Sequence, residues 1–332
     1  KDGILIELDK PILFLYEQVF NLKDSNYTRR ALVGRVRIED FEKKVILPHE
    51  KTLSAPKEDR YKLIKTTNLQ SEPIFGIVID NGQVKDISDS YALQNSELIF
   101  EFTDENDIKH RLYLVGEKLY PLIEKAFDDK RILIADGHHR YETALRIKKE
   151  FEKSENYRED APYNYILMCV VSSLDSGLVV QPIYRVLKVD DEKLGKLSGY
   201  ITRETEVENI EKLSYMDLSR DEFIFVKKDR IMWIKLGNTN DDRTSVEILH
   251  EEIITKMFEI NEKDIAERQV IRYFKKVNEA FSSLKEDDVL IIYNPPKPEE
   301  ISKISEKGKT LPQKSTYFYP KFYSGLFMYP LW

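Results

Sequence analysis

One short segment, residues 136–140, gathers residue types that bind phosphate and move protons: it reads Asp-Gly-His-His-Arg. A strand-like apolar stretch (131–135) precedes it, and apolar residues at helical spacing follow it as far as Phe151. The segment is therefore predicted to be a strand-to-helix turn, with Gly137 allowing the sharp backbone path. The first N–H groups of a helix lack intrahelical acceptors and carry partial positive charge, so this turn is predicted to hold a phosphate.

Each side chain of the turn has a chemistry that suits a phosphorylated ligand. Arg140 offers a fork of donors that matches phosphate oxygens, and His138 and His139 donate when protonated. Asp136 is predicted to bind a divalent metal ion or to accept a proton from a substrate hydroxyl. In a structural alternative, Asp136 caps the helix, Arg140 forms a salt bridge and the histidines lie at the surface. The run of five such residues favours the functional interpretation.

A second charged cluster lies upstream of the turn. Lys57 and Arg60 are predicted to reach phosphates from a lid, while Glu50 or Glu58 serves a metal ion or a hydroxyl. His49 is a candidate general acid or base, because the charge of an imidazole changes near neutral pH. The alternative is a solvated helix start whose charges form surface pairs.

Near the end of the chain, Lys314, Ser315 and Thr316 form a polar group that turns abruptly aromatic. These three residues are predicted to hold a phosphate, or to fold back and complete the site from the far end of the chain. The aromatic residues that follow, 317–319, are predicted to be core or stacking anchors.

The elements that position these residues alternate between strand-like and helix-like stretches. Strands are predicted at 12–16, 31–38, 73–79, 98–102, 111–115, 131–135, 164–173 and 178–187, with helices near 117–127 and 140–151. The polar stretch 48–71 is predicted to be a long loop. Beyond residue 189 we expect a hairpin at 223–226 and 231–236, helices near 247–259 and 274–284, and a strand at 289–293.

This order of elements predicts a mixed α/β fold with two domains and a tail. Residues 1–188 form the domain that carries the turn, and residues 189–293 form a smaller α/β domain. Residues 294–332 contain six prolines, so we expect an extended tail that packs back on the site.

Composition limits the classes of protein. Of 332 residues, 41% are hydrophobic and 33% are charged, as in globular chains, and no apolar run approaches the roughly 20 residues that span a bilayer. The net charge of −7 argues against a nucleic-acid partner. The one cysteine, Cys169, lies in an apolar run and is predicted to be buried and inert. We therefore expect a reducing compartment, the cytoplasm.

Three stretches resemble the uncharacterised DUF 1015 family. They are residues 136–144 (DGHHRYETA), residues 47–52 with 56–60 (LPHEKT and PKEDR), and residues 312–321 (PQKSTYFYPK), in order along nearly the whole chain. Where the family tends to have Pro-x-His-Arg, this chain has Tyr184 before Arg185, so no role of that histidine is carried over.

More remotely, the turn from Gly137 to Arg140 followed by Ala144 is similar to the nucleotide-binding turn of the ParB/sulfiredoxin superfamily, which includes kinases of free serine. The resemblance implies a ParB/sulfiredoxin-like mixed-sheet core that binds nucleotide in residues 1–188. It also suggests a catalytic role for Glu50 or Glu58. The catalytic cysteine of sulfiredoxins has no counterpart in this turn, which has histidines instead.

Three hypotheses follow for the function. The preferred one is phosphoryl transfer from ATP or ADP to a small hydroxyl-bearing metabolite, with free serine as the first guess. In it the turn holds phosphates, Asp136 or Glu50 takes the acceptor's proton or holds Mg²⁺, and three basic residues neutralise charge: Lys57, Arg60 and Lys314. The second is a nucleotide-binding switch that hydrolyses slowly or not at all. The third is a metal-dependent hydrolase with the histidines of both motifs and Asp136 as ligands.

Overall fold

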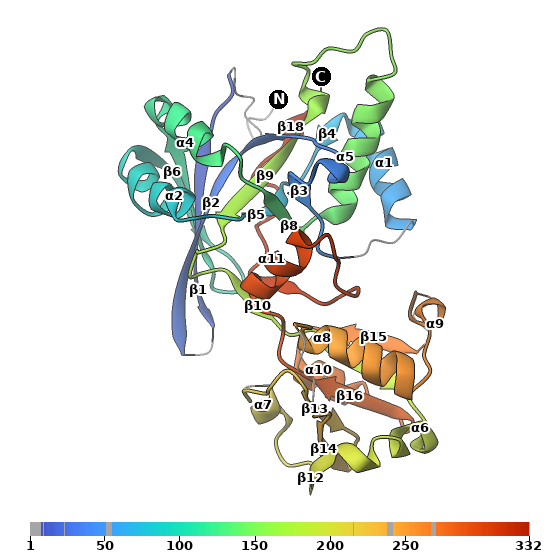
Figure 1. Cartoon of the computed structure of the whole chain (residues 1–332). Coiled ribbons are helices and arrows are strands. Elements are labelled where there is room, and N and C mark those ends of the chain that lie inside the picture. Colours follow the sequence, from blue (N-terminus) through green and yellow to red (C-terminus); the bar gives the residue numbers. More distant parts are fainter. Residues whose placement is uncertain are drawn as a thin grey trace. The chain divides into compact units, whose positions relative to one another are not determined.

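The computed structural model describes residues 8, 10–22, 24–50, 55–214, 216–237, 242–266 and 270–331. Backbone contacts divide the chain into two compact units. Unit 1 holds residues 1–179, 302–310 and 320–332, and unit 2 holds residues 180–301 and 311–319. The end of the chain therefore contributes to both units, and Figure 1 shows the elements of each.

Unit 1 is built on a mixed eight-stranded sheet in the order β3-β8-β5-β9-β2-β1-β7-β6. Its strands are β1 (Phe14–Leu22), β2 (Ser25–Arg37), β3 (Ile46–Leu47), β5 (Ile74–Val78), β6 (Ser96–Thr103), β7 (Lys109–Val115), β8 (Ile132–Asp136) and β9 (Tyr165–Ser172). β3 pairs with β8 and β5 with β9 in parallel, and the other neighbours are antiparallel. Both faces of β5, and of β8 as far as Ala135, are buried, which explains their apolar sequences.

Helices pack on one face of this sheet. They are α5 (His138–Phe151), α4 (Tyr120–Phe127) and the successive segments α2 (Gln83–Asp86), η2 (Ile87–Tyr91) and α3 (Ala92–Gln94). Ile134 of β8 and Tyr141 of α5 belong to the core that these elements share. α1 (Ala55–Thr67) packs beside α5, where Ile64, Ile147 and Leu331 form a smaller cluster. Short 3-10 turns connect the elements: η1 (Phe41–Lys43), η3 (Glu117–Leu119) and η4 (Pro162–Asn164).

The last residues of the chain pack on the opposite face of the sheet. Successive side chains of a strand point to opposite faces, so Leu15 joins the helix-covered core while Tyr16 faces the other way. The Tyr16 ring lies 5.4 Å from that of Phe322, and the Phe75 ring lies 4.7 Å from the same ring, measured between centroids. Farther along, β18 (Tyr329–Pro330) pairs with β4 (Leu69–Gln70).

Unit 2 is built on an antiparallel six-stranded sheet in the order β12-β14-β13-β16-β11-β15. Its strands are β11 (Tyr184–Lys188), β12 (Ile201–Glu206), β13 (Glu222–Val226), β14 (Arg230–Lys235), β15 (Ile271–Phe274) and β16 (Asp288–Ile292). Its helical segments are α6 (Asp191–Gly195), η5 (Ser198–Tyr200), α7 (Ile210–Leu213), α8 (Ser245–Ile248), the π-helical η6 (Leu249–Met257), α9 (Glu262–Ala266) and α10 (Val277–Ser282). A separate two-stranded sheet joins β10 (Val179–Gln181) to β17 (Tyr317–Tyr319).

The predicted hairpin at 223–226 and 231–236 is confirmed as β13 and β14. The strands predicted at 98–102 and 111–115 are confirmed as β6 and β7, which form an antiparallel pair. The single strand predicted for 178–187 is wrong in one respect, because Pro182 separates β10 from β11. Proline lacks the N–H that a strand ladder needs.

Two helices contradict the predictions. α1 occupies most of the stretch 48–71, which contradicts the predicted loop and agrees with the alternative of a helix start in this stretch. Its sequence is polar because it buries little: Ile64 is covered, whereas Leu63 remains exposed. The tail, predicted to be extended throughout, contains α11 (Pro298–Glu306). A proline is tolerated in the first helical turn because the N–H there has no intrahelical acceptor.

The mixed α/β fold class is confirmed by the two sheets and their helices. The predicted boundary between 188 and 189 falls at the end of β11, inside unit 2. Cys169 of β9 is a buried free cysteine, and burial raises the pKa of its thiol. In the described part of the chain, none of the helices combines the length and apolar character needed to cross a membrane.

Candidate functional site

Three neighbouring strands of unit 1 bring distant parts of the chain together where β3 and β8 end and β5 begins. This row of strand ends is called the edge of the sheet here. β3 and β8 run parallel, so the residues that follow both strands emerge side by side. β5 runs antiparallel to β8, with Phe75 opposite Asp136, so the residues just before β5 reach the same edge. His49, Asp136 and Glu72 therefore lie at this edge, and Glu50 follows His49 as a partly buried residue.

Gly137 makes the turn between β8 and α5. Its φ of 98° and ψ of 24° are left-handed. The left-handed backbone angle favours glycine, and a Cβ here would lie 2.8 Å from Cδ1 of Ile74 and 3.1 Å from Nη2 of Arg140, so the ends of these side chains would have to shift. No side chain caps the helix, and its first turn contains no acid. The strand, turn and helix predicted from the sequence are confirmed, with the helix starting at His138.

Asp136, the last residue of β8, stands between two cations. Lys321 Nζ lies 2.7 Å from Oδ1, and Arg140 Nη2 lies 2.9 Å from Oδ2. Burial raises the pKa of this carboxyl, but the charges of Lys321 and Arg140 outweigh burial and hold the pKa of Asp136 below its ordinary value. Asp136 is therefore ionised near neutral pH, and it accepts from cations instead of capping α5.

Arg140 connects the turn to the loop before β5. Its Nη1 donates to the carbonyl oxygen of Pro73 at 2.7 Å and lies 3.1 Å from Oε2 of Glu72. The salt bridge of the structural alternative is therefore present. The guanidinium fork that we expected to be open for phosphate is held by two carboxylates, those of Glu72 and Asp136. A phosphate at the turn would share Arg140 with these groups.

His49 and His138 pack edge to face, with ring centroids 4.7 Å apart. The backbone N–H of His49 donates to Nε2 of His138 at 3.4 Å, and Nδ1 of His49 lies 2.6 Å from the carbonyl oxygen of Ile134. A carbonyl only accepts, so Nδ1 of His49 carries the proton. Burial lowers the pKa of His49 to about 4 and lowers the pKa of His138 well below its ordinary value. Both imidazoles are neutral at pH 7, which removes the positive charge that we expected from a protonated His138.

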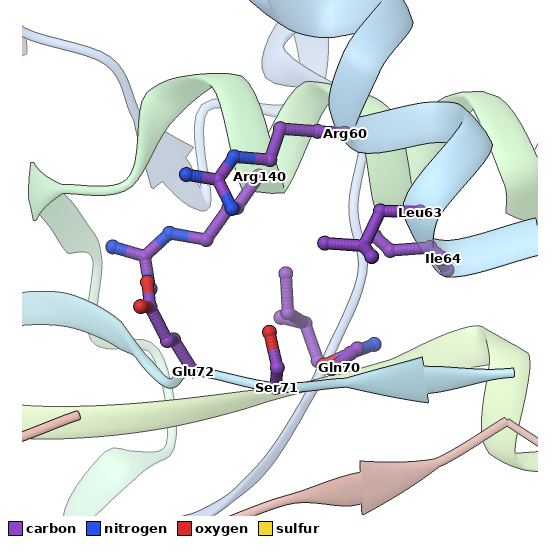
Figure 2. Close-up of a pocket in the computed structure, with 8 residues that line it drawn as sticks. Arg60, Leu63, Ile64, Gln70, Ser71, Glu72 and Arg140 are labelled. Carbon is purple, nitrogen blue, oxygen red and sulfur yellow. The ribbon is translucent and has the colours of Figure 1, made fainter. Parts of the chain in front are cut away.

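A pocket lies between α1, α5 and the loop that precedes β5 (Figure 2). The side chains of eight residues line it: Arg60, Leu63, Ile64, Gln70, Ser71, Glu72, Arg140 and Ile166. The structure thus brings together Arg60 and Arg140, which were predicted from two separate motifs. Among the described residues, Arg60 forms no salt bridge.

The other predicted residues have different surroundings. Glu58 pairs with Arg146 at 2.9 Å, and both side chains are about half exposed, so this is a surface pair. The side chain of Lys57 lies outside the described residues. Residues 314–316 belong to unit 2, where Ser315 is fully buried and its hydroxyl donates to a backbone carbonyl of the same turn.

Lys321 and Glu72 were not among the site residues predicted from the sequence. Lys321 ends the motif 312–321, and its aromatic, proline-rich context was the available signal. Glu72 follows a polar stretch that carries no signal of its own. Lys321 is held by two buried residues: Gln18 Nε2 donates to its carbonyl oxygen at 3.1 Å, and Arg29 donates to the carbonyl oxygen of Pro320.

Metal ligands are not gathered at this edge. In the part of the chain that the structure describes, no group of three or more His, Cys, Asp or Glu residues could hold a metal ion. Nδ1 of His49 and Nε2 of His138 bond to the backbone, and both oxygens of Asp136 are in ion pairs. The hydrolase hypothesis therefore lacks a ligand set in these residues, and Mg²⁺ at Asp136 stays a prediction.

Comparison with known proteins places the chain in a family. No functionally curated protein matches the sequence. A family model described as "Protein of unknown function (DUF1015)" matches residues 1–253, well over half of the chain. The chain belongs to the DUF1015 family. The matched span contains the turn at 136–140 and the charged motif upstream of it, so two of the three motifs that resembled the family lie within it.

Solved structures similar to this DUF1015 protein overlap it only loosely. A conserved hypothetical protein from Pyrococcus furiosus is 15% identical, with a TM-score of 0.44, and the match covers 90% of this chain and 95% of that one. A free serine kinase in complex with AMP is 13% identical, with a TM-score of 0.43 and 86% of each chain covered. SbnI from Staphylococcus aureus, with a C-terminal truncation, is 12% identical, with a TM-score of 0.48, and 90% of this chain and 87% of that one are covered. None of these scores reaches 0.5.

Proposed function

We propose that this DUF1015 protein is a nucleotide-dependent phosphotransferase that acts on a small hydroxyl-bearing metabolite, with free serine as the first acceptor to test. The phosphates of ATP or ADP would bind at the start of α5. We also propose that unit 1 is related to the ParB/sulfiredoxin superfamily, on the basis of the turn from Gly137 to Arg140 followed by Ala144.

One observation carries this proposal: an ionised carboxylate stands at the uncapped start of a 14-residue helix, between two cations. The helix start and Lys321 both attract a polyanion, and Arg140 would share its charge with it. Asp136 provides an acceptor for a hydroxyl proton in the same place. Phosphoryl transfer needs mainly positioning and charge neutralisation, and these groups supply both.

In the proposed reaction, the acceptor's hydroxyl oxygen bonds to the terminal phosphorus of the nucleotide. The bond from that phosphorus to the bridging oxygen breaks, and the nucleotide leaves with one phosphate fewer. The hydroxyl proton passes to Asp136, with Glu50 as the second candidate base. Mg²⁺ would arrive on the phosphate oxygens and neutralise their charge. The roles assigned to Lys57, His139 and residues 314–316 stay predictions.

A nucleotide-binding switch is the second candidate, and one observation favours it. Both oxygens of Asp136 already accept from cations, and its lowered pKa makes it a weak base. A site of this kind would bind phosphate well and transfer it slowly.

The test measures nucleotide binding and phosphoryl transfer separately. Thermal shift with ATP, ADP and CTP in the presence of Mg²⁺ should show stabilisation by at least one nucleotide, because a ligand that binds only the folded state raises its stability. ³¹P NMR with serine and other small alcohols should then show a phosphorylated product. Absence of binding by all three nucleotides would contradict the proposal, and binding without product would favour the switch.

Two variants of unit 1 locate the activity. Lys321→Met should weaken ADP binding about tenfold, the effect of losing one charge-assisted hydrogen bond. Asp136→Asn should slow transfer by about 100-fold or more while ADP still binds. Lys118→Met removes an exposed lysine of η3 and is the matched control, expected to leave both measurements unchanged.

A further inference from the structure

The pocket in Figure 2 has a charged side and an apolar side. The guanidinium groups of Arg60 and Arg140 lie on one side, with the carboxylate of Glu72 beside Arg140. Leu63 and Ile64 of α1 face them from the other side. Its enclosed part measures only about 20 Å³, close to the space of one water, so the pocket is an open hollow in which a small ligand would stay partly in solvent. A ligand that fits it has one charged end and a short aliphatic part.

Gln70 holds in place Ile166, an apolar residue that lines the pocket. Its Oε1 accepts from the backbone N–H of Leu167 at 2.9 Å, and its Nε2 donates to the carbonyl oxygen of Tyr165 at 3.0 Å. Both ends of this buried amide are therefore tied to β9, on either side of Ile166. Ile166 is therefore held in place as one wall of this hollow.

Positive side chains outnumber negative ones among the residues that line the pocket. Two of the three charged lining residues, Arg60 and Arg140, are basic. Glu72 already has partners for both oxygens: Oε2 lies 3.1 Å from Arg140, and Oε1 accepts from Ser324 at 3.2 Å. Arg60 adds a second positive charge on the same side, and no described residue forms a salt bridge with it. Because Glu72 and Asp136 already engage Arg140, the surplus positive charge at this wall is that of Arg60, and it favours an anionic ligand.

We propose that this pocket binds the acceptor, and that the acceptor is a small hydroxycarboxylate anion without an ammonium group, in place of the free serine named above as the first acceptor to test. Its carboxylate would pair with Arg60, its carbon chain would lie against Leu63, and its hydroxyl would point toward the turn. Arg140 supports this direction, because one of its nitrogens lies 2.9 Å from Asp136 while its side chain lines the pocket. The assignment of the pocket to the acceptor rests on the proposed phosphotransferase function.

The class of acceptor follows from Glu72. An amino acid such as serine carries an ammonium group that needs an acidic or carbonyl partner. The carboxylate of Glu72 is the acid among the lining residues, and it is engaged by Arg140 and Ser324. A hydroxycarboxylate needs no such partner. It is therefore the better match to a pocket with a surplus of positive charge.

Calorimetric titration with three probes tests this inference on the full chain. Glycerate should bind with measurable affinity, whereas glycerol, which replaces the carboxylate by a hydroxymethyl group, should not. L-serine, which replaces one hydroxyl by an ammonium group, should bind at least tenfold more weakly than glycerate. Failure of glycerate to bind, or equal binding of glycerate and glycerol, would overturn the inference. Tighter binding of serine would overturn the assignment of the acceptor class.

Variants of α1 show whether Arg60 is responsible. Arg60→Gln should weaken glycerate binding about 10- to 100-fold, as expected for loss of a hydrogen bond to a charged group. Lys62→Gln removes an exposed positive charge from the same helix and should leave the affinity unchanged. An equal loss in both variants would contradict a specific role of Arg60.

Nucleotide binding separates this inference from the proposed function. If a nucleotide binds and a phosphorylated product forms with another alcohol while glycerate does not bind, the acceptor pocket is wrong and the phosphotransferase proposal stands. If glycerate binds through Arg60 and no nucleotide binds, the pocket is a carboxylate site and the phosphotransferase proposal fails.

Discussion

At the scale of single residues, the candidate site combines an ionised acid with two neutral imidazoles. Asp136 keeps its negative charge because Lys321 and Arg140 lie against its two oxygens. His49 and His138 carry no positive charge at pH 7, because burial lowers the pKa of both imidazoles. The charge that a phosphate meets here therefore comes from lysine, arginine and the helix start. The two histidine rings pack against each other beside these charged groups.

His49 makes stability depend on pH. Its pKa is about 4 in the folded state, against roughly 6.5 when unfolded, because burial disfavours the imidazolium form. Between these values the unfolded chain binds the proton and the folded chain does not, so stability falls as pH drops from about 6.5 to about 4. The loss from this residue is about 3 kcal/mol in all.

The measurement is urea unfolding of the wild type and of His49→Asn at several pH values in this window. The variant loses packing and should be less stable than the wild type at pH 7. As the pH is lowered, however, its free energy of unfolding should fall less steeply than that of the wild type, by about 1.4 kcal/mol per pH unit, because one fewer proton is bound on unfolding. Parallel pH profiles of the two proteins would contradict the lowered pKa.

At the scale of elements, the site depends on how α5 begins and on what packs beside it. Gly137 ends β8 in a left-handed conformation, so that α5 starts directly at the sheet edge. α1 then packs along α5 and brings Arg60 to the pocket that Arg140 also lines. The two arginines of the pocket thus come from two neighbouring helices, and their spacing depends on that helix pair.

Gly137→Ala should destabilise unit 1 through two effects. The alanine would be strained at a φ of 98°, and its Cβ would meet Ile74 and Arg140 at 2.8 and 3.1 Å. We expect a loss of about 2 to 4 kcal/mol and weaker ADP binding. Gly82→Ala is the matched control, because Gly82 has a φ of 111° and open space around its Cβ.

The comparison of these two variants in urea unfolding isolates the packing effect. Gly82→Ala should cost only the backbone strain, about 1 to 2 kcal/mol, and should leave ADP binding intact. Equal losses in the two variants would mean that the close packing around Gly137 contributes nothing.

At the scale of the whole molecule, the last segment of the chain packs against the first strands of unit 1. Arg29, a fully buried residue of β2, lies between the rings of Phe75 and Phe322 at 4.8 and 4.7 Å from their centroids. It donates to Gln18 and to the carbonyl oxygen of Pro320. Burial lowers the pKa of Arg29 to about 10, which leaves it charged at pH 7. A buried cation thus anchors the last segment of the chain, from which Lys321 reaches Asp136.

Arg29→Met should release this last segment. Methionine can fill the space between the two rings but cannot donate to Pro320 or Gln18, so we expect a loss of about 2 to 4 kcal/mol. Limited proteolysis followed by mass spectrometry should show cleavage near residues 320–332 in the variant before any other cut. ADP binding should weaken as in Lys321→Met, because the lysine loses its position.

Arg37→Met is the control for this experiment. Arg37 lies in the same strand, β2, but its side chain is exposed and pairs with Glu159. It should leave the cleavage pattern unchanged. Protection of residues 320–332 in Arg29→Met would show that the aromatic contacts alone hold the segment.

The sequence by itself determined the local features of this protein. A strand, a glycine and a helical repeat around Gly137 predict the turn, because backbone conformation there depends on neighbouring residues. Buried strands and the buried Cys169 were predictable for the same reason. For the stretch that forms α1 the sequence left a loop and a helix start as alternatives, because its polar residues bury little by themselves; packing against α5 favours the helix.

Only the tertiary structure decided which charges meet. Lys321 lies 185 positions from Asp136 in the sequence, and Arg60 and Arg140 come from separate motifs. These pairs depend on the order of strands in the sheet and on the path of the last segment, which no local pattern records. The same contacts changed the expected roles: Arg140 holds carboxylates, and burial leaves His138 neutral. Electrostatic roles follow from partners and burial, and both arise only when distant parts of the chain pack together.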